Sequence, residues 1–333
     1  MTGTEVDQSC LEDYHAQFSD MIAQSDSDAL KRFIAARDAL PVRERIVAGS
    51  DMKFLAGLKL FDADGSYSGL VAYDKSAVRT LEDWAVRHIH EMIHVMQFDR
   101  SAALHAIPAN SDALFWLSPR DFMFSQIALE IDAYAKQGWL TNEFARISGC
   151  DLERDSYSLA RDFAHAAEQN GHDTRKALAY MGVMQCFNGT MRSTVDGEGA
   201  VPFVFNYQRH AHDCYVSAIQ RRIDEYGTDY VQAMEYVRLT ADDIIAMTDT
   251  LGVGSMINGK GELCEVYAPG DVHEDIKIAA HELGSHLQVA PRDELPTLEE
   301  GLARYGTTAP EIITATYGST YGSTYGPRAP EIG

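Results

Sequence analysis

The stretch that decides the fold of this 333-residue chain is residues 87–97, which read Arg87-His88-Ile89-His90-Glu91-Met92-Ile93-His94-Val95-Met96-Gln97. It contains the pattern HExxH. Because an α-helix turns by about 100° per residue, His94 lies about 40° and Glu91 about 100° from His90 around a helix. The opposite arc is apolar and comprises Ala85, Val86, Ile89, Met92, Ile93 and Met96. The stretch therefore predicts an amphipathic helix with a core face and a polar face directed at a cleft.

The polar face has the chemistry of a zinc site. Two imidazoles one helical turn apart, His90 and His94, can bind one Zn²⁺ at about 2.0–2.1 Å. Glu91 points to the same cleft, where its carboxylate can act as a general base toward a metal-bound water. His88 lies about 160° from His90 around the helix and is expected to face neighbouring residues. The alternative interpretation is an amphipathic helix whose histidines bind nothing.

The surrounding sequence predicts which elements accompany this helix. Residues 11–40 have helical spacing, and two apolar runs at 54–61 and 67–73 predict strands on either side of a turn. Thr80 predicts the start of the HExxH helix, and Ser118-Pro119 the start of the next one, which Gly138 is expected to end near Gln137. Most of the remaining chain up to residue 250 has helical spacing, apart from an expected long loop at 189–202. The fold class predicted is α+β, predominantly helical.

The stretch 87–97 also resembles the active helix of the HExxH zinc metallopeptidases, the zincins, and notably of bacterial members that have HExxHxxQ. The resemblance covers about residues 53–140. It implies a zincin-like catalytic core with a small sheet, a substrate-lining edge strand before the helix, and peptide hydrolysis with Zn²⁺ as the cofactor. The chain lacks the longer pattern HExxHxxGxxH, which excludes the metzincin branch. The nearest group is an uncharacterised family of bacterial putative metallopeptidases.

A catalytic zinc needs a third protein ligand. In the gluzincin branch, whose third ligand is a glutamate, that ligand comes from a second helix, and here Glu130 occupies the predicted helix that begins at Pro119. Gln126, Tyr134 and Gln137 share its face, and Tyr134 stands where many members carry a second acid. A rival branch uses an aspartate ligand, which leaves Asp132 as the alternative. The transition state also needs an oxyanion partner, which a Tyr, His or Arg from the second half could supply. Residues of these types cluster at Tyr207, Arg209, His210, His212 and Tyr215, but solvated or capping roles are the alternative interpretation, and they are not assigned to the site.

Composition and charge restrict the partners. The 50 acidic and 28 basic residues give a net charge of −22, which disfavours nucleic acid and anionic membrane surfaces. The zincin resemblance implies a peptide or protein substrate. The polar N-terminus lacks the pattern of a signal peptide, no 18-residue apolar run occurs, and the five cysteines are scattered, so a cytoplasmic location is expected.

The sequence thus predicts four segments and one main function. The segments are an N-terminal helical segment at 1–50, the zincin-like core at 51–150, a helical half at 151–305 that completes the cleft, and a low-complexity, disordered tail at 306–333. The main function is that of a zinc metallopeptidase, with His90, His94 and Glu130 as metal ligands and Glu91 as the catalytic base. Two alternatives are a zinc hydrolase of non-peptide amides or esters and a non-enzymatic interaction protein with a vestigial site.

Overall fold

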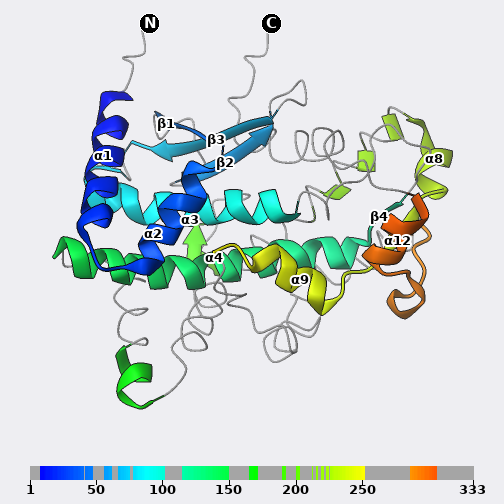
Figure 1. Ribbon diagram of the computed structural model, residues 1–333. Helices are drawn as coiled ribbons and strands as arrows, with labels where there is room; N and C mark the ends of the chain where they lie inside the picture. The colour runs from blue at the N-terminus through cyan, green and yellow to red at the C-terminus, as the bar shows by residue number, and fades with distance from the viewer. Residues whose placement is uncertain are drawn as a thin grey trace, which may run out of the picture. The chain divides into compact units, whose positions relative to one another are not determined.

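The computed structural model describes residues 8–40, 42–47, 56–61, 67–75, 78–101, 115–149, 165–171, 190–192, 200–202, parts of 212–226, 227–251 and 286–305. In this part of the chain helices predominate over a small sheet (Figure 1), which confirms the expected α+β, mostly helical class. No described helix has both the length and the apolar character needed to cross a bilayer. The expected turn at 62–65 and the expected disordered tail at 306–333 lie outside the described residues.

The chain groups into two compact units, each assembled from separate stretches of sequence. The first combines Met1–Met96, Ala133–Met181 and Tyr317–Gly333, and the second combines Gln97–Asp132 and Gly182–Thr316. The division falls within two long helices, after Met96 in one and before Ala133 in the other. The division into four consecutive segments stays a prediction.

The first unit begins with two helices, α1 (Gln8–Gln24) and α2 (Asp28–Asp38), as the helical spacing of residues 11–40 predicted. Ser27 starts α2, and its side chain accepts a hydrogen bond from the amide of Leu30 at 3.4 Å. The two helices pack through Phe18 and Phe33, whose rings are 6.4 Å apart and completely buried.

Three strands form the sheet of the first unit: β1 (Arg43–Val47), β2 (Ala56–Phe61) and β3 (Tyr67–Asp74). β3 lies in the centre, with β2 antiparallel on one side and β1 parallel on the other. The pairing of β2 with β3 agrees with the strands expected at 54–61 and 67–73. β1 was not predicted, because its charged first half, Arg43-Glu44-Arg45, has no strand-like apolar alternation.

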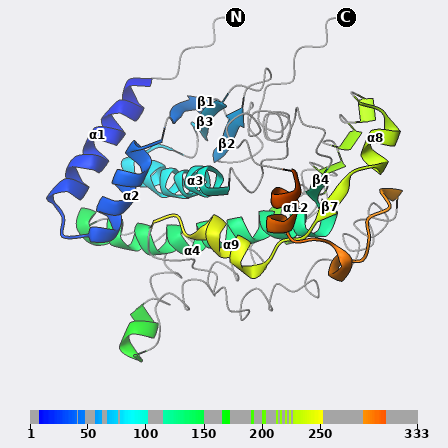
Figure 2. The same cartoon turned by 45° about the vertical axis from the view of Figure 1, so that its right-hand side comes forward.

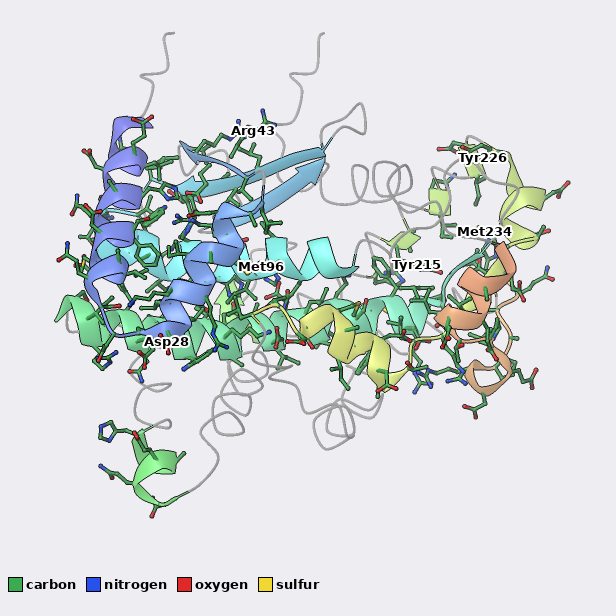
Figure 3. The ribbon with its side chains drawn as sticks, viewed as in Figure 1. Asp28, Arg43, Met96, Tyr215, Tyr226 and Met234 are labelled. Carbon is green, nitrogen blue, oxygen red and sulfur yellow. The ribbon has the colours of Figure 1, made fainter. Side chains whose placement is uncertain are left out.

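Helix α3 (Leu81–Ser101) carries the HExxH pattern and lies between the sheet and the next long helix in both views (Figures 1 and 2). It begins as predicted, because the hydroxyl of Thr80 accepts a hydrogen bond from the amide of Asp83 at 3.1 Å. Its apolar arc is buried throughout. Met96, which Figure 3 labels, is the last residue of α3 that belongs to the first unit.

Helix α4 (Pro119–Ser148) starts at the predicted position and ends later than predicted. The hydroxyl of Ser118 accepts a hydrogen bond from the amide of Asp121 at 3.1 Å, which satisfies one of the free donors at the helix start. The expected end near Gln137 is wrong, since the helix continues through Gly138 to Ser148. A glycine inside a helix costs about 1 kcal/mol, and the complete burial of Leu140 and Phe144 beyond it outweighs that cost.

The second unit contains short strands and helices around the first part of α4. β4 (Phe115–Leu117) pairs in parallel with β7 (Glu235–Val237), and β5 (Thr190–Arg192) pairs antiparallel with β6 (Ala200–Pro202). The β5–β6 pair corrects the expectation of a loop at 189–202, because three-residue strands are too short to show a period. The remaining helices are α8 (Thr228–Gln232), α9 (Ala241–Thr248), the 3-10 helix η2 (Arg292–Glu294) and α12 (Leu298–Tyr305).

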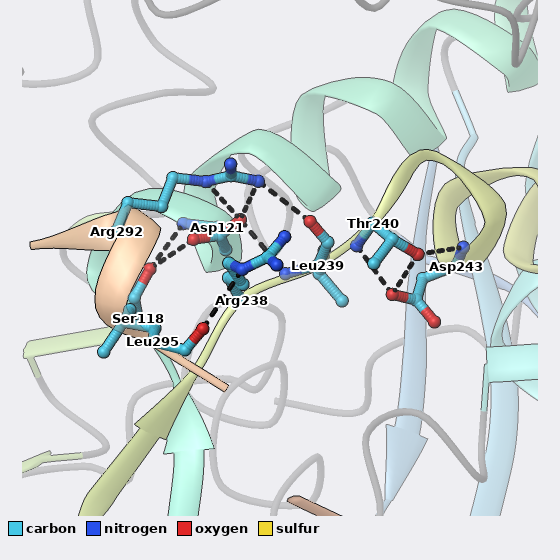
Figure 4. A network of polar contacts seen from close by, with 8 residues as sticks. All are labelled: Ser118, Asp121, Arg238, Leu239, Thr240, Asp243, Arg292 and Leu295. Atoms are coloured by element: carbon cyan, nitrogen blue, oxygen red, sulfur yellow. Dashed lines mark hydrogen bonds and ion pairs between the residues drawn. The ribbon is translucent and has the colours of Figure 1, made fainter. Parts of the chain in front are cut away.

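The buried carboxylate of Asp121 connects segments of the second unit that are far apart in the sequence (Figure 4). Oδ1 of Asp121 accepts hydrogen bonds from the guanidinium of Arg292 at 3.0 Å and from the amide of Leu239 at 3.2 Å. Its Oδ2 accepts the hydroxyl hydrogen of Ser118 at 2.5 Å. The first turn of α4, the segment before α9 and η2 are therefore held by a single side chain.

Candidate metal centre

Helix α3 places the three residues of the HExxH pattern together, as the spacing predicted. His90, Glu91 and His94 are each 8 % exposed, so their polar groups are largely withdrawn from water. The Nε2 atoms of His90 and His94 face one another at 3.1 Å, and the two rings are nearly perpendicular, at 87°.

This arrangement of the two imidazoles fits a shared divalent cation. A neutral imidazole nitrogen without hydrogen carries a lone pair, so two of them at this distance need a proton or a cation between them. Two nitrogen ligands at about 2.0–2.1 Å in a tetrahedral zinc site lie about 3.3 Å apart. The observed 3.1 Å is close to that separation.

Glu130, on α4, supplies a carboxylate to the same place. One of its oxygens and one ring nitrogen from each of His90 and His94 all lie within 4.8 Å of one another. These atoms are three donors of a typical zinc set, two nitrogens and one oxygen. The three residues expected as ligands are thus brought together.

Asp132, the alternative third ligand, is engaged elsewhere. It is completely buried, and its Oδ2 accepts a hydrogen bond from Nε2 of Gln97 at 2.9 Å. The same Gln97 nitrogen donates to the carbonyl of Leu129 at 3.0 Å. Among the described residues, the groups able to hold a metal do not include Asp132, and the geometry therefore favours Glu130.

Two further residues of α4 contact His90 on the face that carries Glu130. The ring of Tyr134 lies 4.6 Å from the ring of His90, and Oε1 of Gln137 lies 3.2 Å from its Nδ1. Nε2 of Gln137 donates to the carbonyl of Val86 at 3.0 Å. The sequence identified this face, but the contact between Gln137 and His90 depends on the packing of α4 against α3 and was missed.

A second group of possible metal ligands, His15, Glu44 and His88, lies in the first unit and was not predicted from the sequence. Glu44 of β1 contacts Nε2 of His15 at 2.9 Å and Nδ1 of His88 at 2.7 Å. The Tyr73 hydroxyl lies 3.2 Å from the same His88 nitrogen. His88 thus faces neighbouring residues, as expected. His15 and Glu44 are far from His88 in the sequence. They come close to it only because α1, β1 and α3 pack together in the fold.

Burial and charge shift the pKa values in this second group. Burial acts to raise the pKa of Glu44, but its interactions with His88 and His15 outweigh this and hold the pKa well below its usual range. Burial lowers the pKa of His88 despite the neighbouring carboxylate. Burial, with the charges of Glu44 and Glu91, raises the pKa of Tyr73 well above its usual value. The group therefore contains an ionised carboxylate, a neutral imidazole and a protonated phenol.

Of the residues suggested as oxyanion partners, Tyr215 has another role. It is buried, and its hydroxyl donates to the carbonyl of Leu117 at 2.8 Å. Figure 3 labels its position. This bond ties it to β4 within the second unit. Tyr207, Arg209 and His210 lie outside the described residues.

Comparison with known proteins adds no relative. No family model matches the chain, and no curated protein or solved structure is detectably similar to it. The chemistry of the site is therefore the basis for its function.

Proposed function

We propose that this protein is a zinc-dependent hydrolase of peptide bonds, with a zincin-like core of the glutamate-ligand branch. The observation that carries the proposal is the 3.1 Å approach of the His90 and His94 nitrogens beside the Glu130 carboxylate. A structural metal would not require Glu91, whose carboxylate follows directly after the first ligand on the same helix.

The proposed roles follow from the positions of these side chains. His90, His94 and Glu130 would hold the ion, leaving its fourth position for water or substrate. When bound, zinc lowers the pKa of a coordinated water and polarises the substrate carbonyl. Glu91 would accept the proton of the attacking water and deliver it to the leaving nitrogen, acting first as base and then as acid.

The sheet supports a peptide as the substrate. β2 pairs only with β3 in the described sheet, so its other edge has backbone groups that an extended peptide can pair with. In the zincin resemblance the hairpin before the active helix, here β2 and β3, supplies this substrate-lining edge strand.

The burial of the site supports a second candidate substrate. His90, Glu91 and His94 are each only 8 % exposed, which suits a narrow pocket better than an open groove. The second candidate is therefore a small amide or ester, hydrolysed by the same residues.

Two substitutions test the proposal. Purified wild-type protein should contain about one zinc per chain by elemental analysis, and His94→Ala should lose it because only two ligands remain. Glu91→Gln should keep the zinc and lose at least a hundredfold in turnover of a peptide library, since general base catalysis contributes about 10²–10⁴-fold.

The same experiment distinguishes the candidates. Cleavage of acetylated amino-acid amides or esters without cleavage of any peptide would favour the small-substrate hydrolase. Zinc-free wild-type protein, or wild-type turnover by Glu91→Gln, would contradict the assigned roles and favour a vestigial site.

A further inference from the structure

We propose that Gln137 is the positioning residue that makes His90 a metal ligand, by fixing which ring nitrogen of His90 carries the hydrogen. The inference rests on the proposed zinc site, and it predicts that a second group of similar residues, His15, Glu44 and His88, binds no metal.

The orientation of the Gln137 amide follows from its neighbours. The carbonyl of Val86 can only accept a hydrogen bond, so the Gln137 atom 3.0 Å away must be the NH₂ nitrogen. The amide oxygen then faces Nδ1 of His90 at 3.2 Å. Because that oxygen can only accept, Nδ1 of His90 must donate and therefore carries the hydrogen.

This hydrogen determines the other nitrogen of the ring. A neutral imidazole carries one N–H, so Nε2 of His90 keeps its lone pair. That lone pair points to Nε2 of His94, 3.1 Å away, where the proposed ion would bind. Metal-binding histidines generally donate their other N–H to an acceptor in this way, and removing such an acceptor weakens metal binding about 10–100-fold.

The second group has the opposite arrangement at His15. Nδ1 of His15 faces the guanidinium of Arg37 at 3.4 Å, and a guanidinium can only donate. The hydrogen of His15 therefore sits on Nε2, which donates it to Glu44 at 2.9 Å. The nitrogen that faces the carboxylate has no lone pair to offer a metal.

His88 is unsuited for a different reason. Its Nδ1 faces an oxygen of Glu44 at 2.7 Å and donates to it. Its Nε2 is buried and has no hydrogen-bond partner among the described residues. Metal binding through Nδ1 would move the hydrogen to Nε2, where no acceptor receives it, and burying an unsatisfied donor is unfavourable. Gln137 thus gives the second N–H of His90 an acceptor, whereas among the described residues no acceptor faces Nδ1 of His15 or Nε2 of His88. This difference distinguishes the proposed metal site from the group around Glu44.

The experiment measures zinc affinity by competition with a chromophoric chelator. Gln137→Met removes the acceptor at nearly constant shape and should weaken zinc binding about 10–100-fold. Gln137→Glu restores an acceptor oxygen and should recover binding to within about tenfold of wild type. Thr141→Val is the matched control, because it removes another buried polar group of α4, one turn further on, and should leave the affinity unchanged.

Three results would overturn the inference. Wild-type zinc affinity in Gln137→Met, with zinc still lost in His94→Ala, would refute the role of Gln137 and leave the proposed function intact. A second equivalent of zinc that Glu44→Gln removes would refute the metal-free assignment of the second group. Absence of zinc binding by wild-type protein would overturn the proposed function and this inference together.

A spectroscopic readout separates positioning from a structural effect. In zinc-loaded protein with ¹⁵N-labelled histidine, His90 should show a protonated Nδ1 hydrogen-bonded to Gln137, and Gln137→Met should shift that signal. Unchanged histidine signals in Gln137→Met would count against the assignment even if the affinity fell.

Discussion

Glu44 is a buried carboxylate that receives hydrogen bonds from residues of different elements, His15 on α1 and His88 on α3, beside Tyr73 on β3. These contacts join α1, the sheet and the HExxH helix α3 within the first unit. Since its charge is partnered rather than solvated, Glu44 is expected to stabilise the fold only while it stays ionised.

The stability of the first unit should therefore depend on Glu44 in a pH-dependent way. Its pKa is lowered in the fold, and an unfolded glutamate titrates near about 4.3. The stabilisation is present above that value and is lost as the pH falls below it toward the folded pKa. We expect Glu44→Gln to lower the free energy of unfolding by about 2 kcal/mol at pH 7.

Urea unfolding of wild type and Glu44→Gln between pH 7 and pH 3 checks this expectation. The difference between the two proteins should be constant down to about pH 5 and shrink below about pH 4. A difference that grows on acidification would mean that the carboxyl is protonated in the fold at neutral pH.

The sequence predicted the relative positions of functional residues where these residues lie on the same helix. His90, Glu91 and His94 were predicted because helical spacing alone places them on one side of α3. Gln137 and Glu44 were not, because the contacts of Gln137 with His90 and of Glu44 with His88 join separate elements. Glu130 was expected from the zincin resemblance, which names a glutamate on a second helix.

At the scale of elements, we expect the start of α4 to depend on Asp121 more than on its capping serine. Asp121 has a 2 % exposed side chain and pairs with Arg292. Removing the carboxylate in Asp121→Ala should cost about 3–5 kcal/mol, because the guanidinium and the Leu239 amide lose their acceptor. Ser118→Ala should cost about 1 kcal/mol, the usual value for a lost helix cap.

Chemical unfolding of the two variants measures this ranking. Asp121→Asn is the matched control and should fall between them, because it keeps an acceptor oxygen and loses the charge. Equal losses in Ser118→Ala and Asp121→Ala would show that the contacts with Arg292 and Leu239 contribute little.

Elements were predicted well where local signals and packing agree. The starts of α3 and α4 followed from Thr80 and from Ser118-Pro119. The end of α4 did not, because the glycine signal at Gly138 competes with apolar burial further along the helix, which no local pattern reveals. β1 was missed for a related reason: its parallel partner β3 lies beyond β2 in the sequence, so only the folded sheet makes it a strand.

At the scale of the whole molecule, zinc should stabilise the folded chain through mass action. A metal that binds only the folded state at a hundred times its dissociation constant adds about 2.7 kcal/mol. The thermal midpoint of metal-free protein should thus rise by several degrees when zinc is added. His94→Ala should show no such rise.

Differential scanning calorimetry with a chelator and with increasing zinc measures this effect. Reversal of the rise by the chelator would attribute it to the metal. An equal rise in His94→Ala would place the responsible ligands outside the HExxH helix.

The 30-residue length of α4 has a consequence for how this protein can diverge. Glu130 and Gln137 are seven positions apart on one uninterrupted helix. This interval corresponds to about 10.5 Å along the helix axis and to a rotation about 20° short of two full turns. Insertion or deletion of one residue between them would rotate one side chain by about 100° around the helix axis relative to the other. The Glu130 carboxylate and the Gln137 amide would then no longer lie on the same face. Insertions and deletions in this interval should consequently be far more damaging than most point substitutions there, and homologues that retain the chemistry should keep the seven-residue interval.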